Sequence, residues 1–158
     1  MFNTIFVVLD ISEMGQKIFD RGVSLAKKYQ SNLILLHVLS AEEDNSPFPI
    51  PANLTDFYAE AGEDLPLEDW RQEWEEFEQQ GLETLKAYSE QAINEGVSTK
   101  YIQVYGSPAQ TISQLAQEWN TDLIVVGHRQ YSGFRGMRLE KVSHYLLNHT
   151  HCSVLIVQ

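Results

Sequence analysis

The sequence predicts an α/β fold, a three-layer sandwich in which helices cover both faces of a five-stranded parallel sheet. Three observations carry this prediction. Continuous apolar, β-branched runs are typical of strands buried on both faces. Longer segments with apolar residues at helical spacing lie between these runs. The two kinds of segment alternate strictly through 158 residues, a length that suits one domain over 1–158.

The first 39 residues are predicted to form a strand, a helix and a second strand. Thr4–Leu9 is a buried strand, and Ser12 is a suitable N-cap for the helix that follows. A second buried strand covers Asn32–Leu39, so a right-handed crossover joins two parallel strands. The buried stripe expected on the first helix consists of Ile18, Gly22, Leu25, Ala26 and Tyr29.

A long acidic segment from about 40 to 69 follows the second strand. It contains four prolines, which oppose both helix and strand, so it is expected to be a mobile surface excursion near the end of that strand. A long helix then runs to about Glu95, with Gly96 placed as its C-terminal cap. Its aromatic and apolar stripe, which begins at Trp70 and Trp74, is interpreted as core.

The second half repeats the alternation. Ser107 and Pro108 form a helix start. The expected buried stripe of that helix consists of Ile112, Leu115, Ala116 and Trp119. The remaining elements are strands at Thr99–Val104, Thr121–Gly127 and Ser153–Val157, and a helix from about Arg138 to Asn148.

Ligands of such sheets bind beyond the carboxyl ends of the strands, where the strand order reverses. The expected order 3-2-1-4-5 places this crevice between Asp10 and Gly127, which end the first and fourth strands. The loop after Gly127 is basic and leads into a helix, whose free amides suit a phosphate.

Charge and composition exclude several classes of protein. The net charge is −11, and thirteen of the 22 acidic residues fall between Glu42 and Glu78, which argues against nucleic-acid binding. No apolar run is long enough for a membrane span, so no membrane partner is expected. The single cysteine, Cys152, rules out an internal disulfide and favours a cytoplasmic location, and it is expected to begin the last strand as a small buried residue.

Neither a metal centre nor a catalytic nucleophile is predicted. The five histidines follow no metal-ligand spacing, and Cys152 lacks a context that would activate it. The protein is therefore interpreted as non-enzymatic.

Four segments resemble the universal stress protein family, which has a Rossmann-like, adenine nucleotide alpha hydrolase-like fold. They are VVLDISE at 7–13, LLHV at 35–38, GSPAQTI at 106–112 and DLIVVG at 122–127. ATP-binding members carry Gly, two residues, Gly, nine residues, Gly, then Ser or Thr. The resemblance implies a nucleotide site of Asp10, Val38, Val126, Gly127, Gln130, Lys141 and Val142.

The spacing of that loop pattern fits this sequence without a gap, but three of its four defining residues differ. Gly127 matches the first glycine, while Gln130, Glu140 and Lys141 replace the other three family residues. A carboxylate at Glu140 repels phosphate. The GHRQ sequence at 127–130 is also similar to the UspA-like branch, which lacks the glycine loop. ATP with magnesium is therefore possible but disfavoured.

Three functions follow as hypotheses. The first is a non-catalytic stress-response protein that acts as a homodimer, with weak or no ATP binding. The second is an adenine-nucleotide-binding module whose basic side chains replace the glycine loop, and the third is a slow ATPase. The last strand lacks the charges and prolines that protect an exposed edge, so a homodimer centred on Val154, Leu155 and Ile156 is expected, as the resemblance also implies. The basic side chains of the second hypothesis are Arg129, Arg135, Arg138 and Lys141.

Overall fold

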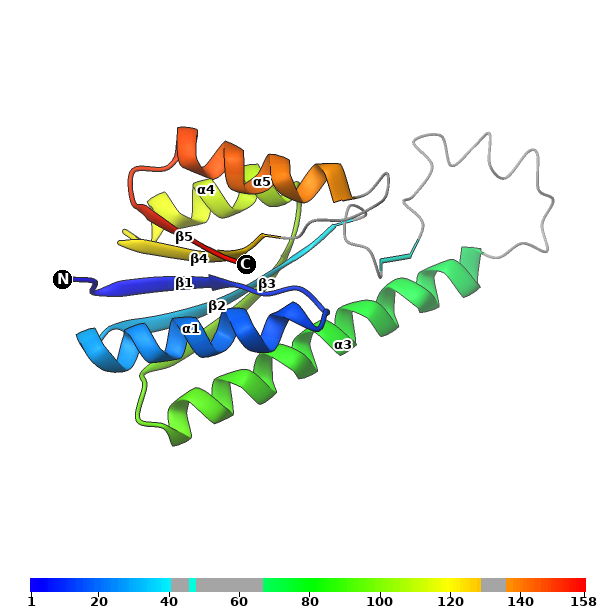
Figure 1. The fold of residues 1–158 in the computed structure, drawn as a ribbon. Coiled ribbons are helices and arrows are strands. Elements are labelled where there is room, and N and C mark those ends of the chain that lie inside the picture. Colours follow the sequence, from blue (N-terminus) through cyan, green and yellow to red (C-terminus); the bar gives the residue numbers. More distant parts are fainter. Residues whose placement is uncertain (41–45, 48–66, 129–135) are drawn as a thin grey trace.

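A computed structural model shows five parallel strands in the order β3-β2-β1-β4-β5 (Figure 1). It describes residues 1–40, 46–47, 67–128 and 136–158, and the side chains of 67–68 and 136–141 are left out of the description. The predicted α/β architecture and strand order are confirmed. The strands are β1 (Thr4–Val8), β2 (Asn32–Leu39), β3 (Thr99–Tyr105), β4 (Leu123–Gly127) and β5 (Ser153–Val157).

The centre of the sheet is covered on both faces, as the apolar runs predicted. In β1, Ile5, Phe6 and Val7 are all completely buried. Ile5 and Val7 belong to the core beneath α1 and α3, while Phe6 belongs to the core beneath α4 and α5. Each fully buried side chain of this size contributes roughly 1.5–3 kcal/mol.

The helices form the two outer layers of the sandwich. Figure 1 shows α1 and α3 on one face of the sheet and α4 and α5 on the other. With 28 residues, α3 is about 42 Å long at 1.5 Å per residue, so its first half extends past the carboxyl edge of the sheet. The helices are α1 (Met14–Tyr29), α3 (Leu67–Asn94), α4 (Pro108–Glu118) and α5 (Gly136–His149).

Glycine allows α1 to approach the sheet closely. A Cβ atom on Gly22 would overlap the Cγ2 atom of Val7, so a side chain at this position would push the helix away from β1. The predicted cap at Gly96 is confirmed, since its φ of 85° is a conformation that favours glycine.

Several local predictions are wrong. Glu13, not Ser12, is the N-cap of α1, because the Ser12 hydroxyl donates to the Asp10 carboxylate instead. Trp119 is 39% exposed, since it follows the last residue of α4 rather than lying on its buried stripe. Cys152 is only half-buried and lies just before β5.

The helix boundaries also differ from those expected. Helix α5 begins at Gly136 and α3 begins at Leu67. Most of the acidic excursion, residues 41–45 and 48–66, lies outside the described residues, so its predicted mobility stays a prediction. No helix of the described part is long and apolar enough to cross a membrane.

Candidate functional site

The sheet brings Asp10, Val38 and Gly127 to its carboxyl edge. Strand β1 lies between β2 and β4, with Val8 opposite Leu36 and Val7 opposite Val125. Asp10 lies two residues after β1, Val38 is the second-to-last residue of β2, and Gly127 ends β4. The predicted site residues on these three strands are therefore neighbours at one edge.

Asp10 is held by the loop that joins β1 to α1. The Ser12 hydroxyl donates to its Oδ1 atom, and the Gly15 amide donates to the Ser12 carbonyl at 3.1 Å. A Cβ atom on Gly15 would lie 3.3 Å from the Asp10 carbonyl oxygen, so the loop packs tightly on the start of the helix. A carboxylate fixed in this way is suited to accept hydrogen bonds from the amino or hydroxyl groups of a ligand.

Three of the predicted apolar residues lie in the core near this edge of the sheet. Val38, Val126 and Val142 are 5–6% exposed and belong to the same core cluster, beneath α4 and α5. They come from β2, β4 and α5, so this cluster depends on the whole fold rather than on one segment. A base at this edge could therefore contact only the small exposed part of these side chains.

Gly127 has a packing role in addition to its place in the motif. A Cβ atom on Gly127 would lie 2.6 Å from the Cδ1 atom of Ile18, which comes from α1 on the other face. The glycine therefore makes room for a core side chain. Its presence alone is not evidence for a phosphate contact.

The predicted phosphate-binding half is only partly described. Arg129, Gln130 and Arg135 lie outside the described residues. Arg138 and Lys141 lie in the first two turns of α5, as does Glu140, but the description stops at their backbone. The structure therefore places these positions at the start of a helix, and the predicted contacts of their side chains lie outside the described residues.

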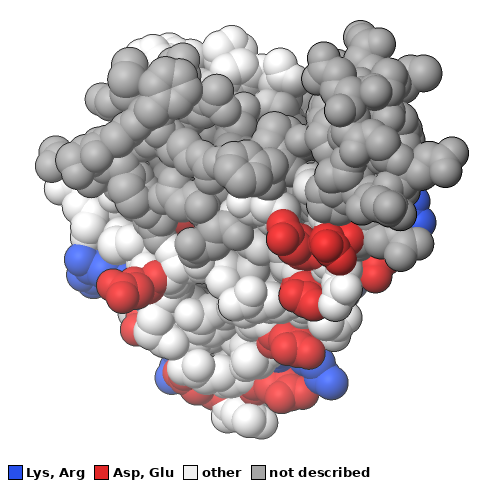
Figure 2. Space-filling view, turned by 90° about the vertical axis from the view of Figure 1, so that its right-hand side faces the viewer, with Lys and Arg blue, Asp and Glu red and all other residues white. Residues whose placement is uncertain are grey.

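The described part of this edge is acidic. Figure 2 looks onto it and shows acidic side chains gathered in its lower half, on the side of α1 and α3. On the first half of α3, Asp69, Glu73, Glu75 and Glu76 are exposed. This surface disfavours the approach of a highly charged anion from the side of α3.

Tyr88 is a neighbour of Asp10 that sequence reasoning assigned only to the core. Its hydroxyl oxygen would lie 3.4 Å from a Cβ atom on Gly15, and its ring packs on Phe19 with 4.5 Å between centroids. Burial raises the pKa of Tyr88 above its usual value of 10.0, and the charges of Asp20 and Asp10 raise it further. The helical stripe of α3 placed Tyr88 on the sheet, but nothing in the pattern showed that it reaches this loop.

His37 is a second residue near the site whose contacts the sequence pattern did not indicate. It is 2% exposed, and its Nδ1 atom lies 2.9 Å from Gln103 Nε2. The same Gln103 nitrogen donates to the Glu78 carbonyl at 3.2 Å, so Nδ1 of His37 accepts a hydrogen bond. This arrangement joins β2, β3 and α3 next to the site.

Metal ligation finds no support among the residues that are described. No group of three or more His, Cys, Asp or Glu side chains in that part of the chain could hold an ion. Burial raises the pKa of the Cys152 thiol, which keeps it in its unreactive protonated form at neutral pH.

Comparison with solved structures shows the same fold. The chain superimposes on the universal stress protein UspA from Lactobacillus plantarum with a TM-score of 0.72 at 21% identity, covering 99% of this chain and 97% of that one. A universal stress protein in complex with cAMP matches with a TM-score of 0.62 at 21% identity, over 99% and 97% of the two chains. An Arabidopsis thaliana family member with AMP bound matches with a TM-score of 0.62 at 18% identity, over 98% and 90%.

Sequence comparison identifies the family. The chain is 34% identical to the universal stress protein YxiE of Bacillus subtilis over 158 residues, covering all of both proteins. It is 30% identical to the universal stress protein Sll1388 of Synechocystis over 158 residues, which is 99% of this chain and 98% of that protein. The family model for the universal stress protein family matches residues 1–158. The chain therefore belongs to the universal stress protein family.

Proposed function

We propose that this protein is a non-catalytic, cytoplasmic stress-response protein that acts as a homodimer and binds Mg-ATP weakly or not at all. The observation that carries the proposal is the altered phosphate loop. Gln130 and Glu140 replace two glycines of the family pattern, and Lys141 replaces its hydroxyl residue. A carboxylate at position 140 repels the phosphates, and the acidic surface of α3 adds to that repulsion.

The predicted adenine-binding half of the site supports a weak affinity for nucleotides with a single phosphate group. Asp10 is held in place by Ser12, and Val38 and Val126 lie near the same edge of the sheet, on the strands that flank β1. Relatives of the same fold have been solved with AMP and with cAMP. In this proposal the base and ribose contact Asp10 and the valines, while the phosphate contributes little.

The second candidate is an adenine-nucleotide-binding module in which basic side chains replace the glycine loop. It is favoured by the nucleotide-bound relatives and by four bases within residues 127–141. The four are Arg129, Arg135, Arg138 and Lys141. Point charges bind phosphate without help from glycines, so this candidate predicts that affinity increases with the number of phosphates.

Restoring the family residues tests the proposal. We expect Mg-ATP to leave the melting temperature of the wild-type protein unchanged, and the Glu140→Gly, Lys141→Ser variant to be stabilised by Mg-ATP. A ligand at 100 times its Kd adds about 2.7 kcal/mol to the free energy of unfolding, which is readily measured. The single variant Lys141→Ser is the control, because it keeps the repelling carboxylate. Stabilisation of the wild-type protein by Mg-ATP that is lost in Lys141→Ser would favour the second candidate instead.

The proposed dimer uses β5, which is an edge strand of the sheet. Val154, Leu155 and Ile156 are only partly buried in the single chain, so they retain surface for a partner. The amides of Ser153 and His128 and the carbonyls of Asp122 and Val157 complete the β4–β5 ladder. Antiparallel pairing of two β5 strands would extend the sheet across a two-fold axis.

A further inference from the structure

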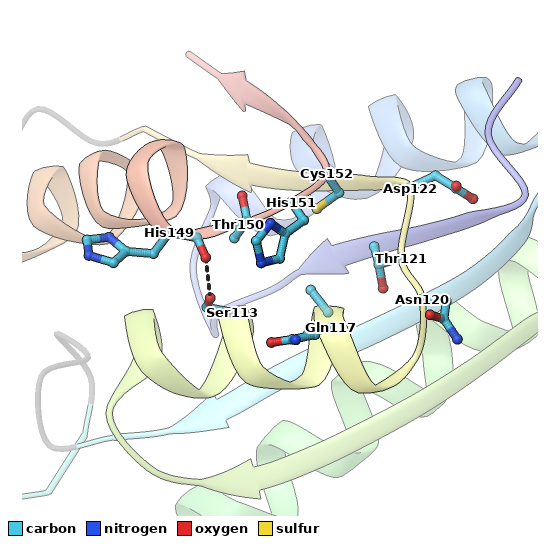
Figure 3. Close-up of a pocket in the computed structure, with 10 residues that line it drawn as sticks. Ser113, Gln117, Asn120, Thr121, Asp122, His149, Thr150, His151 and Cys152 are labelled. Atoms are coloured by element: carbon cyan, nitrogen blue, oxygen red, sulfur yellow. Dashed lines mark hydrogen bonds between the residues drawn. The ribbon is translucent and has the colours of Figure 1, made fainter.

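A cavity of about 390 Å³ opens at the amino edge of the sheet, at the opposite ends of the strands from Asp10 and Gly127 (Figure 3). Three segments form it, namely the second half of α4, the turn that leads into β4, and the turn between α5 and β5. The hydroxyl of Ser113 donates to the His149 carbonyl at 3.2 Å and ties α4 to the end of α5 on one side of the cavity. Its volume lies in the range of small-molecule sites, roughly 300–1,000 Å³.

Thr121 places an unsatisfied polar group in the wall of this cavity. The residue is 8% exposed, and its backbone amide donates to the Ala116 carbonyl at 2.9 Å. Its hydroxyl oxygen, by contrast, is shielded from water and has no hydrogen-bond partner among the described residues. Figure 3 shows that oxygen directed toward Gln117 and Asn120. A buried hydroxyl without a partner is costly, so its retention points to a partner that the chain itself does not supply.

The other side chains of the cavity define which chemistry that partner has. Gln117, Asn120 and His151 are exposed and surround the same space as Thr121. Hydroxyl and carboxamide groups donate and accept hydrogen bonds, and a neutral imidazole does both as well. A ligand that matches them must also donate and accept at several neighbouring atoms, as adjacent hydroxyl groups do.

Charge argues against ionic ligands. No lysine or arginine lines the cavity, so an anion would lack a counter-charge. Its one carboxylate, Asp122, accepts hydrogen bonds from the amides of Asn3 at 2.7 Å and Thr4 at 2.8 Å, and Figure 3 shows it directed away from the cavity. A cation would therefore find no carboxylate turned toward it.

We propose that this cavity is a binding site for a small neutral polyhydroxy compound, a polyol or sugar, with Thr121 as its buried anchor. Because the Thr121 hydroxyl oxygen is shielded from water, a side chain beside it must move before a ligand reaches it, and the exposed Gln117 lines the same cavity. The site is separate from the carboxyl edge and does not depend on nucleotide binding there.

The test is an NMR titration of the isotope-labelled full chain with myo-inositol and, separately, with glycerol. We expect saturable shifts of the amide signals of Gln117, Asn120 and Thr121, with a Kd of about 1 mM for the better ligand, which corresponds to about −4.1 kcal/mol. Ethylammonium chloride and sodium phosphate, at matched ionic strength, serve as cationic and anionic probes and should give no saturable shift. Absence of a saturable response to either polyol overturns the proposal, and so does a stronger response to either ion.

A matched pair of threonine variants separates ligand binding from a structural role. Thr121→Val keeps the shape and removes the unsatisfied hydroxyl, so it should raise the melting temperature while weakening polyol binding at least tenfold. Thr84→Val removes a hydroxyl on α3, far from the cavity, that donates to the Gln80 carbonyl at 2.8 Å. It should leave the polyol response unchanged. Polyol shifts that are the same in Thr121→Val as in the wild type would show that Thr121 is not the anchor and overturn the proposal.

Discussion

At Gly127 the end of β4 and helix α1 come so close that no side chain fits between them. The Cδ1 atom of Ile18 occupies the space that a Cβ atom would need. The motif of the family attributes this glycine to phosphate binding, whereas the structure shows a packing reason for it. A glycine at this position can therefore serve packing whether or not the loop that follows it binds phosphate.

Gly127→Ala is expected to destabilise the protein by about 1 kcal/mol, at the low end of the range for overpacking, because the end of Ile18 can shift. Ile18→Val removes the obstructing methyl group. In a double-mutant cycle by urea unfolding, the double variant should be less destabilised than the sum of the single variants by about 0.5 kcal/mol or more. Strict additivity would show that Ile18 is not the reason for the glycine.

Titration of Tyr88 makes the free energy of unfolding depend on pH in the alkaline range. Burial, and then the charges of Asp20 and Asp10, raise its pKa in the folded state above the value in the unfolded chain. The unfolded chain therefore loses this proton first, and the contribution of Tyr88 is fully present below about pH 10 and is lost as the pH rises through the folded-state pKa. Tyr88→Phe should reduce the fall in the free energy of unfolding between about pH 9 and 11. An unchanged slope would contradict this, and Tyr29→Phe provides the comparison.

At the scale of elements, the docking of α3 on β2 and β3 depends on another close approach. A Cβ atom on Gly81 would lie 2.7 Å from Nδ1 and 2.9 Å from Cε1 of His37, and would overlap Gln103 Nε2. The Gln103 side chain links His37 to the Glu78 carbonyl, and Tyr105 donates to the Glu78 carboxylate at 2.9 Å. This polar contact fixes the position of the helix along the sheet.

Gly81→Ala distinguishes packing from helix propensity. Propensity alone predicts a gain of roughly 0.5–1 kcal/mol, because alanine favours a helix interior. Packing predicts a loss of about 1–3 kcal/mol, because the imidazole of His37 is rigid and buried. We expect a net loss in urea unfolding, whereas the neighbouring exposed variant Gln80→Ala should change stability by less than about 0.5 kcal/mol. A more stable Gly81→Ala protein would refute the packing argument.

Elements were predictable from the sequence where a repeated pattern defines them. Buried strands and helical stripes have many apolar positions, so the order and the approximate bounds of the elements followed from them. The exceptions are single polar contacts. Ser12 has the ordinary features of an N-cap, but its hydroxyl binds Asp10, and this competition between two local partners leaves no trace in the pattern. The link from His37 through Gln103 to Glu78 is a tertiary contact of the same kind.

At the scale of the whole molecule, the open edge of β5 provides a directional test of the dimer. The Ser153 amide donates to the Asp122 carbonyl at 3.1 Å, and the Val157 carbonyl accepts from the His128 amide at 2.7 Å. Odd-numbered residues of β5 therefore bond to β4, and the amide of Val154 points to the open edge. Proline at Val154 and proline at Leu155 should therefore have different effects, because the amide of Leu155 faces β4.

Val154→Pro should convert the dimer to a folded monomer, since it removes an amide needed only by the partner strand. Leu155→Pro should instead lower the stability of the chain itself, because it removes a hydrogen bond to β4. Light scattering at tens of micromolar, with circular dichroism as the check on folding, measures both effects. A wild-type mass near 18.1 kDa, that of one chain, would contradict the dimer. A Val154→Pro protein that remains dimeric would place the interface elsewhere.

The most direct test of the central claim, that the adenine half of the site remains while the phosphate half is lost, is calorimetric titration of the wild-type protein with AMP and with Mg-ATP under the same conditions. The account predicts that Mg-ATP binds no more tightly than AMP, with a Kd of about 1 mM or weaker. A Kd for Mg-ATP of about 1 μM, tighter than that for AMP, would contradict it.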